Sequence, residues 1–140
     1  MHRKERTRIL VESPNELCEI LCKEIEQLYP VNIIENPHNG LVMLKTRENS
    51  KRSLFYLGEV LVTECKVEIN GTIGMGIITC NDERKAYCLA VIDAAYNNKL
   101  PETMLWKKQL RDAAQQLQQQ NTLDNHRIMQ TKVSFETMDK

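Results

Sequence analysis

Apolar residues in the first part of the chain recur at the spacing of an amphipathic helix. These positions are Leu17, Ile20, Leu21, Ile25 and Leu28. Pro30 is expected to end this helix, because proline cannot continue a helical ladder. Ser13 and Pro14 suit its start, and Glu16 can complete a capping box with the Ser13 side chain. A shorter helix is predicted before it, over residues 4–11.

The pattern then changes to runs that are typical of strands. Val31–Ile34 and Leu41–Lys45 are predicted as two strands joined by a loop that contains the turn signal Asn39-Gly40. Leu54–Ile69 is predicted as a long strand that bends near Gly58. Together these segments indicate an antiparallel sheet.

A second hairpin is predicted with a three-residue turn over residues 70–72. This turn pairs Ile69 with Ile73 and keeps one face of both strands apolar, which is what fixes the register of a sheet. It places Gly74 and Gly76 inside a strand, on the face opposite the core. Glycines inside a strand often mark a bulge or the close approach of another backbone.

The same glycines raise the alternative of a nucleotide site. Gly71, Gly74 and Gly76 precede a predicted helix, and phosphates often bind at helix N-termini. Their G-x-x-G-x-G spacing is, however, the reverse of the dinucleotide fingerprint, and no Gly-Lys-Ser/Thr follows. The hairpin is therefore favoured. A free-standing nucleotide-binding protein or small enzyme that uses residues 71–80 is the alternative.

A helix that is apolar on almost every side is predicted after the hairpin. Asn81 or Asp82 caps it, and it runs to about Asn98. Such a helix is normally buried all round, so in a small domain part of it is expected to meet a partner. Asp93 stands nearly alone among its apolar residues. It is either a carboxylate at the rim facing water or part of a buried ion pair across a subunit interface.

The last third of the chain predicts a second helix and a closing strand. The helix spans Pro101–Gln120 and has a narrow apolar stripe, and the strand spans Thr131–Met138. Residues 1–140 are thus predicted to form a single α+β domain. Its antiparallel β-sheet has N-terminal helices before it and two helices and a C-terminal strand after it. The residues predicted to contact a partner are Gly74, Gly76, Asp93, Trp106 and Phe135.

Composition excludes several classes of function. The 140 residues carry 19 Lys+Arg and 19 Asp+Glu, a formal net charge of +0, so no basic excess favours nucleic acid or an anionic membrane. No stretch approaches the roughly 20 apolar residues of a membrane span, and the N-terminus lacks the apolar segment of a signal peptide. A cytoplasmic location is expected, where the five cysteines would be thiols.

The reactive residues form no recognisable reaction centre. Cys18 and Cys22 lie one helical turn apart, but no second pair follows at zinc-site spacing, so buried thiols are favoured. Cys80 precedes a helix N-terminus, which leaves a catalytic thiol as a minor alternative. His38 and His126 lie in polar segments and are expected to be exposed. We expect no catalytic residue, no metal and no cofactor bound by this chain, which suggests a binding or assembly subunit.

Several motifs occur in the order that is typical of one family. They are Gly40-Leu41-Val42, Phe55–Glu59, Thr63–Val67, Gly71–Gly74, Asp82, Ala90–Ala94 and a closing T-x-V-x-F-x-T-M over Thr131–Met138. On these motifs the sequence resembles the PhnG family, small subunits of the carbon–phosphorus lyase core complex. One departure is Cys80-Asn81, which stands where the family often has Gly-Arg.

The resemblance implies a role in bacterial phosphonate catabolism. The family's complex forms α-D-ribose 1-methylphosphonate 5-triphosphate from ATP and methylphosphonate and releases adenine. Partner subunits carry the nucleosidase and radical chemistry, and ATP is a substrate of the complex. The resemblance therefore implies an accessory subunit that is required for this synthesis. Its expected partners are the other core subunits, especially the nucleosidase-like one.

Overall fold

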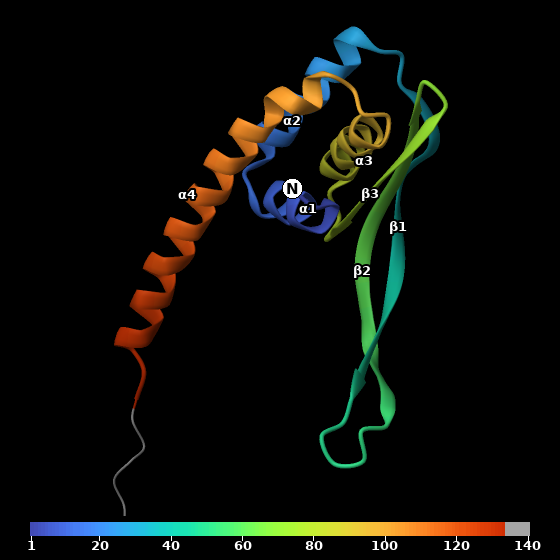
Figure 1. Ribbon diagram of the computed structural model, residues 1–140. Helices are drawn as coiled ribbons and strands as arrows, with labels where there is room; N and C mark the ends of the chain where they lie inside the picture. Colours follow the sequence, from blue (N-terminus) through green and yellow to red (C-terminus); the bar gives the residue numbers. More distant parts are fainter. Residues whose placement is uncertain (134–140) are drawn as a thin grey trace, which may run out of the picture.

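The computed structural model describes residues 1–133 as helices and strands of an α+β fold (Figure 1). The helices are α1 (Arg3–Glu12), α2 (Asn15–Leu28), α3 (Glu83–Asn97) and α4 (Glu102–Gln130). The strands are β1 (Asn32–Arg47), β2 (Leu54–Ile69) and β3 (Thr72–Thr79). They form an antiparallel sheet in the order β1-β2-β3. The predicted class is confirmed, with two helices before the sheet and two after it. Most of the predicted closing strand, residues 134–138, lies outside the described residues.

The helices lie on one side of the sheet (Figure 1). α3 packs on β3 and β2, α2 packs on α3, and α1 contacts α4. The core forms between these helices and the sheet, and the opposite side, here called the open face, carries no helix within residues 1–133. The largest fully buried side chains are Trp106, Leu10, Leu21, Ile25, Ile69 and Ile92.

The turn between β2 and β3 has two residues and not the predicted three. Ile69 pairs with Thr72, and the φ angles of Asn70 and Gly71 are 49° and 77°. A type I′ hairpin needs a positive φ at both central residues, and Asn-Gly is its preferred sequence. The predicted pairing of Ile69 with Ile73 is therefore wrong. Because a shift of one residue reverses every side chain, β3 turns its other face to the core.

Gly74 and Gly76 consequently face the core, where the prediction had placed them on the opposite face. A Cβ added to Gly74 would overlap the carbonyl oxygen of Ala90, and a Cβ added to Gly76 would overlap that of Ala86. The predicted close approach of another backbone is thus present, and that backbone is α3 of the same chain. Three large β3 side chains lie exposed on the open face, Ile73, Met75 and Ile77, whereas Ile78 is buried in the core.

β1 is one strand, where the sequence predicted two strands joined by a loop. Register shifts on both sides of Glu35 accommodate the Asn36-Pro37 segment. β1 is an edge strand, and proline is tolerated at an edge or a bulge because no central ladder bond is lost. Asn39 and Gly40 pair with β2 and form no turn. The predicted bend at Gly58 coincides with a further register shift.

The two N-terminal helices are confirmed, but the predicted capping box is not. α2 begins at Asn15 with no side-chain cap, and the hydroxyl of Ser13 is buried without a hydrogen-bond partner. The backbone N–H of Ser13 instead closes α1. Lys85 of α3 holds this junction, because its ammonium group donates to the carbonyl oxygens of Val11 and Ser13 at 2.9 and 3.0 Å.

α4 continues to Gln130, ten residues beyond its predicted end at Gln120. Its first half is anchored by Trp106 and Leu110, which are fully buried. Residues 118–130 are all exposed, and this half of the helix extends away from the body (Figure 1). Glutamine is a good helix former, and the segment has no glycine or proline to stop the helix.

We predict that Gly76→Ala destabilises the fold, whereas Gly40→Ala does not. Overpacking a core costs about 1–3 kcal/mol, and we expect about 3 kcal/mol because the added methyl meets rigid backbone of α3. At Gly40 a methyl meets only side-chain atoms of Val62 and Glu64 at 3.8 Å. Urea unfolding of both variants measures the difference. Equal midpoints would show that α3 does not lie directly on β3.

Candidate protein interface

β1 and β2 extend beyond the end of β3 as a two-stranded arm, residues 41–61 (Figure 1). β3 pairs with β2 only as far as Val62, whereas β1 and β2 stay paired as far as Arg47 and Leu54. No residue of the arm is buried. The arm therefore adds nothing to the core of its own chain.

The arm carries large apolar side chains on both faces. Successive residues of a strand point to opposite faces, and the adjacent cross-strand pairs Leu41–Leu61 and Val42–Val60 are both apolar. A two-stranded hairpin is marginally stable alone in water, so we expect another protein surface to pack on this one. Exposed apolar patches of this kind mark interaction sites. Its large side chains, 41–63% exposed, are Leu41, Val42, Met43, Leu44, Leu54, Phe55, Tyr56, Leu57 and Leu61.

The open face of the sheet continues this surface beyond the base of the arm. Here an apolar row on β3 lies beside a charged row on β2. The paired residues are Ile73 with Glu68, Met75 with Lys66 and Ile77 with Glu64. An apolar strip bordered by charges is a common form of protein interface, with an apolar centre and a polar rim.

Asp93 is buried and is paired within its own chain. Its carboxylate oxygens accept hydrogen bonds from Arg3 Nη2 at 2.7 Å and Arg6 Nη2 at 2.8 Å. Oδ2 also accepts from the backbone N–H of Met75 and from Asn97 Nδ2, both at 3.2 Å. Of the two interpretations, the buried ion pair is the one observed, but it joins α1, α3 and the edge of β3 and needs no second subunit.

Arg6 completes this cluster on the side of the core. Its guanidinium carbon lies 3.9 Å from the ring centroid of Tyr96, a cation–π contact. Burial lowers the pKa of Arg6, and the Asp93 carboxylate opposes that effect. Arginine stays protonated far above neutral pH, so the guanidinium keeps its charge. The ring of Tyr96 meets that of Trp106 edge to face, with centroids 5.8 Å apart.

Four of the five residues predicted to meet a partner lie inside the chain. Gly74 and Gly76 pack on α3, Asp93 is enclosed by arginines, and Trp106 is fully buried with its indole N–H donating to a glutamate of α2. Phe135 lies outside the described residues. Within residues 1–133, the arm carries exposed apolar side chains on both of its faces, and the sequence had predicted these segments only as strands.

The cysteines are placed largely as predicted. Cys18, Cys22 and Cys65 are buried free thiols. Burial raises the pKa of both Cys18 and Cys65 to about 11, so these thiols are protonated and unreactive at neutral pH. Cys80, just after β3, is exposed.

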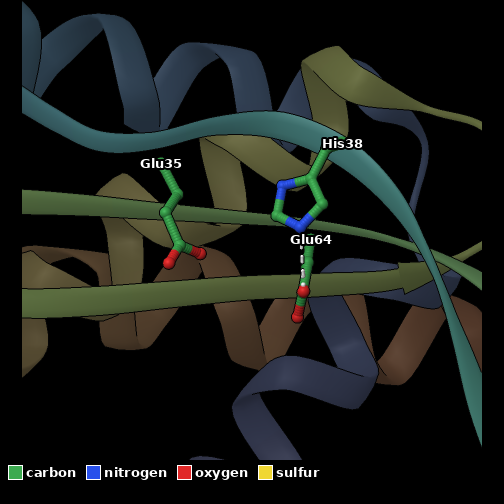
Figure 2. Close-up of side chains that lie close together, drawn as sticks. All are labelled: Glu35, His38 and Glu64. Atoms are coloured by element: carbon green, nitrogen blue, oxygen red, sulfur yellow. Dashed lines mark ion pairs between the residues drawn. The ribbon is translucent and has the colours of Figure 1, made fainter.

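Three polar side chains meet at the base of the arm, on the open face (Figure 2). Glu35 and His38 come from β1 and Glu64 from β2, and their donor atoms lie within 4.8 Å of one another. His38 Nε2 lies 3.0 Å from Glu64 Oε1, and the Glu35 carboxylate is 2.8 Å from the ammonium group of Lys66. His38 is exposed, as predicted, but it lies in β1 and not in a turn. The sequence did not predict this group, because only the register shifts of β1 assemble it.

These features define a small α+β subunit with an apolar arm that residues 1–133 of its own chain leave exposed. Comparison with family models identifies it more closely. The family described as phosphonate metabolism protein PhnG matches residues 1–140, the whole chain. The chain belongs to this family, which confirms the predicted resemblance and assigns it to phosphonate metabolism as a subunit of a protein complex. No curated protein matches the chain. Within residues 1–133, no helix is long and apolar enough to cross a membrane.

We predict that Asp93→Ala destabilises the isolated chain by about 3–5 kcal/mol, because the buried Arg6 loses its counter-charge. The control is Asp124→Ala, which removes an exposed pair with Arg127 at 3.7 Å and should change stability by about 0–1 kcal/mol. The free energy of unfolding in urea measures both. A loss at Asp93 no larger than that at Asp124 would contradict the role of this cluster in the fold.

Proposed function

We propose that this chain is a non-catalytic subunit of the carbon–phosphorus lyase core complex and that its arm holds it against a partner subunit. Membership of the PhnG family supports the pathway. The observation that carries the role is the arm itself, whose large apolar side chains are exposed on both faces. Burying apolar surface yields about 25 cal/mol per Å², so a partner that covers the arm gains substantial binding energy.

In this proposal the complex makes α-D-ribose 1-methylphosphonate 5-triphosphate from ATP and methylphosphonate. The bond between ribose C1′ and adenine breaks, a bond from C1′ to a phosphonate oxygen forms, and adenine leaves. ATP is a substrate of the complex, and this subunit supplies no cofactor to the reaction. Its contribution is to shape the nucleosidase-like partner so that phosphonate, and not water, reaches C1′. Excluding water from a closed site suppresses such hydrolysis.

The chemistry of the described residues supports an accessory role. The buried carboxylate of Asp93 is engaged by two arginines. The thiols of Cys18 and Cys65 are buried and protonated. These groups serve the fold, whereas the arm presents apolar side chains to a partner.

The alternative of a nucleotide binder using residues 71–80 is disfavoured by the packing of α3. Gly71 lies in the tight turn, and the backbone of Gly74 and Gly76 is covered by α3. A phosphate cradle needs free backbone N–H groups and space above the glycines. That space is filled by alanine residues of the helix.

We further propose that the complex works in the cytoplasm. The support is the cysteine content: Cys80 and the four buried cysteines, Cys18, Cys22, Cys65 and Cys88, are free thiols. Unpaired thiols are typical of a reducing compartment.

The test is a reconstitution with the nucleosidase-like partner, ATP and methylphosphonate. We expect the wild-type chain to raise the yield of phosphonate product relative to hydrolysed ribose triphosphate. The double variant Leu41→Glu/Leu57→Glu should lose most of this effect because it places two charges on the arm. The control is Leu105→Glu on α4, since Leu105 is at least as exposed, at 71% against 63% and 62%.

Two results would contradict the proposal. If the wild-type chain leaves the product ratio unchanged, it does not direct the reaction. If the arm variant acts like wild type, the arm is not the surface that holds the partner. Circular dichroism should show that all variants keep their fold, because each altered side chain is exposed.

A further inference from the structure

We propose that Glu35, His38 and Glu64 form a binding site for Zn²⁺ at the base of the arm. The site is independent of the proposed function, because it rests on the geometry of these three side chains. Figure 2 shows the imidazole of His38 directed at Glu64, with Glu35 beside it on the same face of the sheet.

The register shift in β1 is what brings the ligands together. Glu35 and His38 are three positions apart, so in a regular strand they would point to opposite faces. The shift between them lets Glu35 pair with Lys66 and His38 pair with Glu64. Lys66 and Glu64 are two residues apart on β2 and share the open face. Bulges of this kind often re-aim side chains at functional sites.

The donor set and its spacing suit zinc. One imidazole nitrogen with carboxylate oxygens is a known zinc ligand set, with bonds of about 2.0–2.2 Å, which puts neighbouring ligand atoms roughly 3.3 Å apart. His38 Nε2 and Glu64 Oε1 are already 3.0 Å apart. Glu35 must release Lys66 and swing inward, which its flexible side chain allows. Three protein ligands leave a fourth position for water or for a group from another molecule.

The contacts of His38 orient its ring for metal binding. Nδ1 lies 3.0 Å from the carbonyl oxygen of Asn36, and Nε2 lies 3.0 Å from the Glu64 carboxylate. Both neighbours are acceptors, whereas a neutral imidazole has only one N–H. With Nδ1 directed at the Asn36 carbonyl, Nε2 is the ring nitrogen placed to bind a metal ion beside Glu64. An Nδ1–H bonded to a backbone carbonyl is the usual support of a metal-binding histidine.

Protons and zinc therefore compete for Nε2. The hydrogen bond to the Asn36 carbonyl raises the pKa of His38 against the effect of desolvation, and Glu64 raises it further. The charged groups around the ring are Glu35 on β1 and Glu64 and Lys66 on β2, while β3 offers the neutral Ile77 opposite Glu64. Zinc affinity should fall as the pH is lowered through the pKa of His38, because the protonated ring cannot bind metal.

The experiment is a titration of the full chain with ZnCl₂ in a chelator-free buffer, followed by calorimetry. We expect one Zn²⁺ per chain and a loss of affinity of at least tenfold in His38→Ala and in Glu64→Gln. The controls are Glu68→Gln, a carboxylate on the same strand and face outside the group, and His126→Ala, an exposed histidine of α4. Both controls should bind as wild type does.

A second readout identifies the ligands. Co²⁺ bound in place of zinc should give visible bands of nitrogen and oxygen ligation that disappear in His38→Ala. An intense near-ultraviolet thiolate band, lost in Cys80→Ser, would overturn the proposal by moving the metal to the cysteines. Absence of zinc binding, or binding unchanged in both His38→Ala and Glu64→Gln, would also overturn it.

Discussion

The contact of α3 with the bare backbone of β3 is the constraint on which the rest of the structure depends. Gly74 and Gly76 provide no side chains, and the small Ala86 and Ala90 let the helix lie directly on the strand. Because β3 turns Gly74 and Gly76 inward, the alternating residues Ile73, Met75 and Ile77 must point outward to the open face. The same contact brings the carboxylate of Asp93 to the strand edge.

Part of the outer edge of β3 is consequently blocked from pairing with another strand. The backbone N–H of Met75 donates to Asp93, and the carbonyl of Ile73 accepts from Asn97 Nδ2 at 3.0 Å. Covered edges are one way in which proteins prevent unwanted strand addition. The arm and the open face, by contrast, carry exposed apolar side chains that a partner can cover.

The sequence predicted the elements better than their faces. α2 and α3 follow from periodicity and from Pro30 and Asp82, and the Asp82 side chain does cap α3 by accepting from the backbone N–H of Lys85. The face of β3 was predicted wrongly because large apolar residues were assumed to mark the core. The contact between β3 and α3 is lined by glycine and alanine. Hydropathy gives little indication that residues this small are buried. The Asn70-Gly71 dipeptide, which prefers a two-residue turn, was the signal that could have corrected the register.

Neither the interface nor the polar group at its base could be predicted from the sequence, and the reasons differ. Apolar runs in the arm indicate burial. The local sequence does not show whether the same chain or a partner chain buries these residues. The group of Glu35, His38 and Glu64 depends on the register shifts of β1 beside Pro37, and a bulge cannot be located from one strand alone. Both features arise from how the strands pair, not from a motif.

The most direct test of the account is hydrogen–deuterium exchange of residues 41–61 in the isolated chain and in the assembled complex. The account predicts at least tenfold slower exchange at the arm in the complex, while the amides of α3 stay equally protected in both states. Arm exchange that is unchanged in an intact complex would contradict the central claim that a partner covers this hairpin.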